Sequence, residues 1–144
     1  MIKYIILMIS IVCLVVSCAH GPIGSLPKID NPEEAAELII IRNNSIIGAT
    51  NSYKITLNKQ DILAIRVGEY TKFQVKSGNN SLGVKCFGGW SPTWKHMNID
   101  VSCKPGNKYY FLISPGGSCA KIEPLKEEDG LKWISESKYF PVEK

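Results

Sequence analysis

Short runs of apolar residues in strand-like patterns, each ended by turn-forming residues, follow one another through most of this 144-residue chain. In TKFQVKS, for example, Phe73 and Val75 alternate with lysine and glutamine. A period of two places apolar side chains on one face of a strand and polar side chains on the other. Eight such runs occupy residues 38–42, 53–58, 61–67, 71–77, 81–87, 98–103, 108–114 and 119–125. Repeated short strands at this spacing predict an all-β sandwich or barrel of antiparallel strands.

Turn sequences separate several of the predicted strands. They are KSGNNS at 76–81, KPGN at 104–107 and SPGGS at 114–118. Glycine and asparagine accept positive φ angles, and proline sets the first angle of a turn. The segment PEEAAE at 32–37 has the composition of a single helical turn ahead of the first strand.

The C-terminal residues 126–140 change character. Leu131, Ile134 and Lys138 fall on helical spacing, and three acidic residues at 127–129 precede them. Negative charge is favourable near the N-terminus of a helix because of the helix dipole. We therefore expect a short C-terminal helix that packs on the sheet.

The N-terminus carries one lysine, Lys3, followed by an apolar run from Tyr4 to Val16 that is broken only by Ser10. A helix that spans a bilayer needs about 20 apolar residues. A cleaved secretory signal has a positive start and an apolar run of about 7–15 residues that ends in small residues. We therefore expect residues 1–17 to be a signal peptide.

The end of that run resembles the lipobox of bacterial lipoproteins, since Val15, Val16 and Ser17 precede Cys18. The resemblance implies cleavage before Cys18 and two or three acyl chains on that residue, which would anchor the protein stably to a membrane. Because Ala19 rather than aspartate follows, it also implies delivery to the outer membrane in a cell with two membranes. The alternative is an ordinary signal peptide with Cys18 as half of a disulfide.

Two further regions follow the signal peptide. Residues 18–32 are rich in glycine, proline and serine and predict a flexible, lipid-anchored tether. Residues 33–144 have the size of a single domain with one core.

The 17 basic and 13 acidic residues of the chain are spread along it. A nucleic-acid partner is therefore not expected, because such proteins cluster basic residues on one face.

Residue patterns for catalysis are weak in this chain. The two histidines, His20 and His96, have no second ligand at metal-binding spacing. No G-x-S-x-G context surrounds a serine, and the glycine-bearing turns lack the helix and lysine of a phosphate-binding loop. We therefore expect neither an enzyme nor a metal site nor a cofactor, and the sequence leaves a small-molecule ligand unknown.

The segment CFGGWSPTWKHM, residues 86–97, is the most unusual part of the predicted surface. It places Phe87, Trp90, Trp94 and His96 in a connection that glycine and proline should keep from being a strand. Aromatic residues exposed on a loop often mark a binding site. These four residues are the candidate contact for a partner. The alternative is that a tryptophan folds back to cap the open end of the sheets.

The order of several motifs resembles a family of small bacterial lipoproteins known as domain of unknown function 2846. The motifs are AAELIIIRNN at 35–44, VGEYTKFQV at 67–75, VKSGNNSLGVK at 75–85 and PGNKYYFLIS at 105–114. The resemblance covers about residues 35–140 and implies a β-sandwich on a lipid anchor, with no established activity. The chain departs from the family where Asn80 or Ser81 replaces a usual histidine.

Three functions are compatible with these features. The first is a non-catalytic, lipid-anchored envelope protein that acts as a protein-interaction or structural module, with an envelope or secretion-system protein as partner. The second is a glycan-binding or peptidoglycan-binding module that uses Trp90 and Trp94 as stacking platforms. A hydrolase or inhibitor without a recognisable motif is a third possibility.

Three cysteines remain outside the expected signal peptide and anchor: Cys86, Cys103 and Cys119. An oxidising compartment favours disulfides. If the strands run up and down in sequence order, Cys86 and Cys119 lie at the same end of the sheet and Cys103 at the other. We therefore predict a Cys86–Cys119 disulfide and a free, buried Cys103. Strict alternation places Cys119 on the solvent-exposed face of its strand. The disulfide therefore needs an irregular strand start or a position at the edge of the sandwich.

Overall fold

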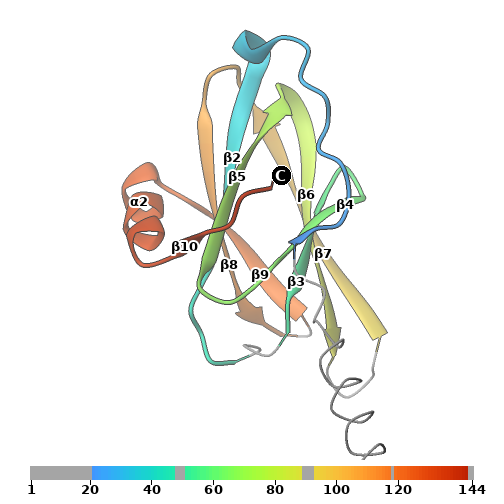
Figure 1. Cartoon of the computed structure of the whole chain (residues 1–144), viewed down its shortest axis with the longest axis vertical. Coiled ribbons are helices and arrows are strands. Elements are labelled where there is room, and N and C mark those ends of the chain that lie inside the picture. Colours follow the sequence, from blue (N-terminus) through green and yellow to red (C-terminus); the bar gives the residue numbers. More distant parts are fainter. Residues whose placement is uncertain (1–20, 48–50, 89–92, 118, 143–144) are drawn as a thin grey trace, which may run out of the picture.

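The computed structural model describes residues 21–47, 51–88, 93–117 and 119–142, and these form two β-sheets packed face to face (Figure 1). In chain order the elements are β1 Gly21–Pro22, the 3-10 helix η1 Pro32–Glu34, β2 Ala35–Arg42, β3 Tyr53–Leu57, β4 Gln60–Ile65, β5 Glu69–Lys76, β6 Gly78–Gly88, β7 Thr93–Cys103, β8 Lys108–Gly116, β9 Cys119–Leu125, α2 Glu127–Ser135 and β10 Lys138–Tyr139. The predicted β-sandwich with a short C-terminal helix is confirmed.

The two sheets do not follow the sequence order of the strands. One sheet, called sheet A here, has the order β1-β4-β3-β6-β7, and the other, sheet B, has the order β10-β5-β2-β8-β9. The chain crosses from sheet B to sheet A at Ser77, between β5 and β6. Most neighbouring strands are antiparallel, but β2 and β8 pair in parallel. The simple up-and-down order assumed from the sequence is therefore wrong.

Alternating side chains fill the space between the sheets. Leu38 and Ile40 of β2 point into this main core, together with Val75, Val84 and Ile113 from other strands. The intervening Ile39 and Ile41 are also buried, because they pack under α2 on the outer face of sheet B. Residues 38–41 are thus apolar without a break because β2 is covered on both faces.

The helix α2 packs on the outer face of sheet B, as predicted. Gly130 lies against the ring of Tyr110, so closely that a Cβ atom at this position would overlap it. Trp133 and Ile134 pack beside that contact. Leu131, which the helical spacing assigned to the packed face, is instead 53% exposed. The acidic residues at 127–129 occupy the first turn of the helix, as expected.

The segment that precedes η1 runs along the sandwich. Gly21 and Pro22 pair with Ala64 and Leu63 of β4. The backbone amides that follow, at residues 23 and 24, both donate to the carbonyl of Ile62, at 2.9 and 3.0 Å. Among the described residues, backbone pairing with the sandwich is thus present from Gly21, within the residues expected to act as a tether.

The two ends of the sandwich differ. At the lower end in Figure 1, strands β2, β4, β6 and β8 finish and β3, β5, β7 and β9 begin. At the upper end lie the start of β2 and the turns that follow β3, β5 and β7. The candidate site residues that the structure describes lie on sheet A toward the lower end.

Candidate functional site

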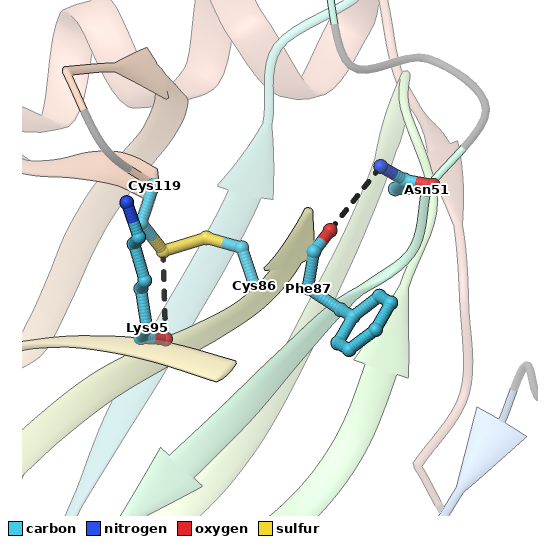
Figure 2. The surroundings of a disulfide bond; sticks show 5 residues. All are labelled: Asn51, Cys86, Phe87, Lys95 and Cys119. Carbon is cyan, nitrogen blue, oxygen red and sulfur yellow. Dashed lines mark hydrogen bonds between the residues drawn. A yellow bond between two sulfur atoms is a disulfide. The ribbon is translucent and has the colours of Figure 1, made fainter. Parts of the chain in front are cut away.

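A disulfide joins the two sheets near the lower end of the sandwich (Figure 2). It links Cys86 of β6 to Cys119 of β9, with 5.5 Å between the Cα atoms. Cys103 is free and buried. The predicted pairing and the free cysteine are confirmed. Both cysteines lie at the same end of the sandwich, as expected, but Cys86 lies in sheet A and Cys119 in sheet B, so the bond joins the two sheets and not two strands of a single sheet.

The position of β9 explains how Cys119 can form this bond. Cys119 alternates with Ala120 and Ile122, which point into the core, so it belongs to the outward set. However, β9 is the edge strand of sheet B and lies against β6 and β7 of sheet A. At such an edge an outward side chain can reach across to the other sheet. The Cys119 Sγ also lies 3.7 Å from the carbonyl oxygen of Lys95 in β7 (Figure 2). The disulfide therefore places β9 against both strands of the β6–β7 hairpin.

Phe87 and Trp94 form an exposed aromatic pair on the outer face of sheet A. They are direct cross-strand partners on β6 and β7, and their ring centroids are 5.4 Å apart. The two residues are 48% and 51% exposed. The prediction that this segment is a loop is wrong for Phe87, Trp94 and His96, because all three lie in strands. Antiparallel pairing of β6 with β7 satisfies their backbone groups despite the nearby glycines.

Neighbouring groups hold this aromatic pair in place. The Nζ atom of Lys54 in β3 lies 4.2 Å from the centroid of the Trp94 ring, which is a cation–π contact. The Asn51 side chain donates to the carbonyl oxygen of Phe87 at 3.4 Å (Figure 2). Trp90, the second tryptophan predicted to bind a partner, lies outside the described residues, as does Cys18.

A cluster of polar side chains lies further up the same face, above Gly83. Thr56, His96 and Asn98 converge there, in space that a Cβ on residue 83 would occupy. The Thr56 hydroxyl and His96 Nε2 are 3.3 Å apart. We call Thr56, His96 and Asn98 the polar cluster. Glycine at position 83 leaves space for the polar cluster. The sequence alone does not reveal this role of Gly83, because it depends on the alignment of β3, β6 and β7.

An ion pair borders the polar cluster. Lys85 Nζ lies 2.5 Å from Asp61 Oδ1, and the two side chains are 29% and 30% exposed. Lys85 is the direct partner of His96 across β6 and β7. The outer face of sheet A therefore presents an aromatic pair at its lower end and polar, hydrogen-bonding groups above it.

Arg42 is a buried charge that the sequence patterns did not single out. Its residue is 1% exposed, and its Nη1 donates to the carbonyl oxygens of Asn51 at 2.6 Å and Ile65 at 2.9 Å. Desolvation lowers its pKa, whereas the nearby Tyr53 and Glu69 act in the opposite direction. Arginine stays charged even so, because its ordinary pKa is so high. Arg42 thus ties together chain segments at the lower end.

The free cysteine at the upper end is in an unreactive setting. Burial raises the pKa of the Cys103 thiol, which outweighs a hydrogen bond from Asn80 that acts to lower it. The buried Asn80 also donates to the carbonyl of Lys76 at 2.9 Å and accepts from Asn58 at 3.1 Å. A thiol that stays protonated is a poor nucleophile. Cys103 is therefore part of the core.

A groove of about 720 Å³ lies on the side of the sandwich opposite the disulfide. Its lining includes Leu26 and Lys28 of the N-terminal segment, Lys72 and Phe73 of β5, and Val142 near the C-terminus.

Within the described ranges, no group of three histidine, cysteine or acidic residues could hold a metal ion. Among the same described residues, each helix is too short or too polar to cross a membrane.

Comparison with known proteins does not add to this picture. No family model, no curated protein and no solved structure matches the chain.

Proposed function

We propose that this protein is a non-catalytic, lipid-anchored protein of the bacterial cell envelope whose β-sandwich is a protein-interaction or structural module. The lipobox-like sequence before Cys18 supports the anchor, and Ala19 supports an outer-membrane location facing the periplasm. The order of motifs between residues 35 and 114 supports a relationship to the lipoproteins with domain of unknown function 2846.

The outer face of sheet A is the proposed contact surface. The observation that carries this proposal is the Phe87–Trp94 pair, which exposes about half of each residue beside the polar cluster. Half-exposed aromatic residues flanked by hydrogen-bonding groups are typical of protein interfaces. The corresponding face of sheet B is covered by α2 over β2 and β8. A partner is therefore expected to bind sheet A.

The polar cluster is arranged for structure and recognition more than for catalysis. Thr56 is only 1% exposed, so a substrate has little access to its hydroxyl group. His96 Nε2 lies against that hydroxyl, and Asn98 lies beside both groups. A general base needs its target within hydrogen-bond reach in an accessible geometry. The Thr56–His96 contact favours a fixed recognition surface.

A glycan-binding module is the second candidate. The half-exposed ring of Trp94 next to His96 and Asn98 favours it, because sugars stack on aromatic rings and bond to such polar groups. One face of the ring is already occupied by Lys54, which leaves less of it for stacking. This contact makes the protein-interaction module the better-supported function.

Cross-linking in intact envelopes tests the proposal. The wild type, the double variant Trp94→Ala, His96→Ala and the control variant Leu131→Ala would be purified after cross-linking and their partners identified. Leu131 is a matched control, since it is 53% exposed on α2, which covers the opposite sheet. We expect the double variant to lose protein partners that the control keeps. Identical partners and yields for all three proteins would contradict the proposal, and loss of sacculus binding alone would support the glycan module.

A further inference from the structure

The register of β1 determines where the N-terminal segment enters the sandwich. Gly21 pairs with Ala64, the residue before the end of β4, and Pro22 pairs with Leu63. Because β1 and β4 are antiparallel, the N-terminal end of β1 lies beside the C-terminal end of β4. That end is the lower end of the sandwich, where Ile65 pairs with Tyr53.

Covalent geometry limits how far an anchor at Cys18 could be from this end. Cys18 precedes Gly21 by three residues. An extended residue spans at most about 3.3–3.6 Å, so the connection reaches no further than about 11 Å. A lipid on Cys18 would therefore keep β1, and the lower end beside it, close to the bilayer surface.

The lower end carries large apolar side chains that are unusually exposed. Ile46 and Ile47, in the segment that follows β2, are 91% and 74% exposed. The same end holds the Phe87–Trp94 pair, and Asn51 connects the two regions through its bond to the Phe87 carbonyl. Figure 1 shows the segment after β2, the end of β6 and the start of β7 at one end of the molecule. Clustered exposed apolar residues mark an interaction surface.

Three basic residues belong to the strands and connections at the same end of the sandwich. Lys54 lies over Trp94, Lys95 lies beside the disulfide on β7, and Arg66 follows the end of β4. Lysine and arginine extend their charged groups toward lipid headgroups, while tryptophan favours the boundary between headgroups and acyl chains. Isoleucine, tryptophan and basic residues at one end are the composition of a segment that enters a membrane interface.

We propose that the lower end of the sandwich is seated on the bilayer, with Ile46 and Ile47 inserted among the acyl chains and Trp94 at the level of the headgroups. This inference rests on the proposed lipid anchor at Cys18. Trp94 at the level of the headgroups then marks the lower boundary of the surface on sheet A, so a protein partner would contact the aromatic pair and the polar cluster at the membrane surface.

Depth-dependent quenching of tryptophan fluorescence tests this orientation. The full, lipid-modified protein would be reconstituted into vesicles of equimolar phosphatidylethanolamine and phosphatidylglycerol that contain a brominated phospholipid. One variant keeps only Trp94, through Trp90→Phe and Trp133→Phe. The matched control keeps only Trp133, which packs in α2 on sheet B. We expect several-fold stronger quenching of Trp94 than of Trp133, and equal quenching would overturn the proposal.

A second pair of variants tests the isoleucines in the Trp94-only protein. Ile46→Ser with Ile47→Ser should reduce the quenching of Trp94, whereas Leu131→Ser should leave it unchanged. Circular dichroism and thermal unfolding would show that both variants fold. Unchanged quenching after the isoleucine substitutions would also overturn the proposal.

The mass of the intact protein separates this inference from the proposed function. A mass without acyl chains would refute the anchor and, with it, both proposals. A mass with acyl chains, combined with equal quenching of the two tryptophans, would refute only the seated orientation.

Discussion

The guanidinium carbon of Arg42 lies 3.8 Å from the centroid of the Tyr53 ring, and both residues are buried. Arg42 also donates to the carbonyl oxygens of Asn51 and Ile65. It therefore joins the end of β2 to the start of β3 and the end of β4. This interaction connects the two sheets at the lower end, because β2 belongs to sheet B whereas β3 and β4 belong to sheet A.

Replacing Arg42 with methionine should destabilise the protein strongly. The change removes the cation–π contact and leaves the two carbonyl groups without this donor, and each buried polar group left unpaired costs about 1–3 kcal/mol. We expect a loss of about 3 kcal/mol or more in the free energy of unfolding, measured in urea. Arg66→Met is the control, because Arg66 is exposed. Equal stability of the two variants would show that Arg42 contributes little.

Removing the disulfide should weaken the attachment of β9 to the β6–β7 hairpin. Cys86 and Cys119 are 33 positions apart in the sequence. A cross-link that closes a loop of this size contributes about 3–4 kcal/mol on the chain-entropy model. We expect the double variant Cys86→Ala, Cys119→Ala to lose that amount in chemical unfolding. Non-reducing peptide mapping of the wild type gives an independent check, and a peptide that links Cys103 to either partner would refute this connectivity.

Gly130→Ala should destabilise the protein even though alanine favours helices. The gain in helix propensity is about 1 kcal/mol. The added Cβ would overlap the buried ring of Tyr110, and such overpacking costs about 1–3 kcal/mol. We expect a net loss, seen as a lower thermal midpoint. Lys132→Ala, on an exposed position of the same helix, should have little effect. A more stable Gly130→Ala protein would mean that α2 moves away from sheet B at little cost.

The stability of the protein should fall in alkaline solution, and Tyr110 should contribute to the fall. Burial raises the pKa of Tyr110, and the charge and hydrogen bond of Glu127 and the charge of Glu37 raise it further. The folded state therefore holds this proton more tightly than the unfolded state, so stability decreases as the pH rises above the ordinary tyrosine value of about 10. We expect Tyr110→Phe to reduce this decrease in unfolding measurements. An unchanged pH dependence would exclude Tyr110 as a source of it.

Cys18→Ser should prevent lipid attachment. A cysteine thiol is the site of acylation that the lipobox-like sequence implies, and serine cannot replace it. Cells that are given a palmitate analogue should label the wild type but not the variant. Cys103→Ser serves as the control, since Cys103 is buried in the fold. Equal labelling of the wild type and Cys18→Ser would refute the predicted anchor.

Local patterns along the chain were enough to locate the strands β2 to β9, but not the two-residue strands β1 and β10. The alternation of Phe73 and Val75 with polar residues identified β5, and its two buried residues do lie in the main core. The turn predicted at KPGN is also present, and its Gly106 has the positive φ angle of 72° that glycine accepts easily. In residues 86–97, glycine and proline were poorer guides to where the strands end. Pairing along β6 and β7 there overrides the local preference and makes Phe87 and Trp94 neighbours on one face.

The order of strands and the contacts between sheets depended on the tertiary structure. The sequence by itself determined which residues alternate, which cysteines remain for a disulfide and where the helix begins, since these properties depend on neighbouring residues. Only the tertiary structure decided that Cys86 and Cys119 belong to different sheets, that Arg42 is buried and that Thr56, His96 and Asn98 gather above Gly83. These residues come from strands far apart in the chain, and the pairing of such strands is set by which faces bury the most apolar surface together.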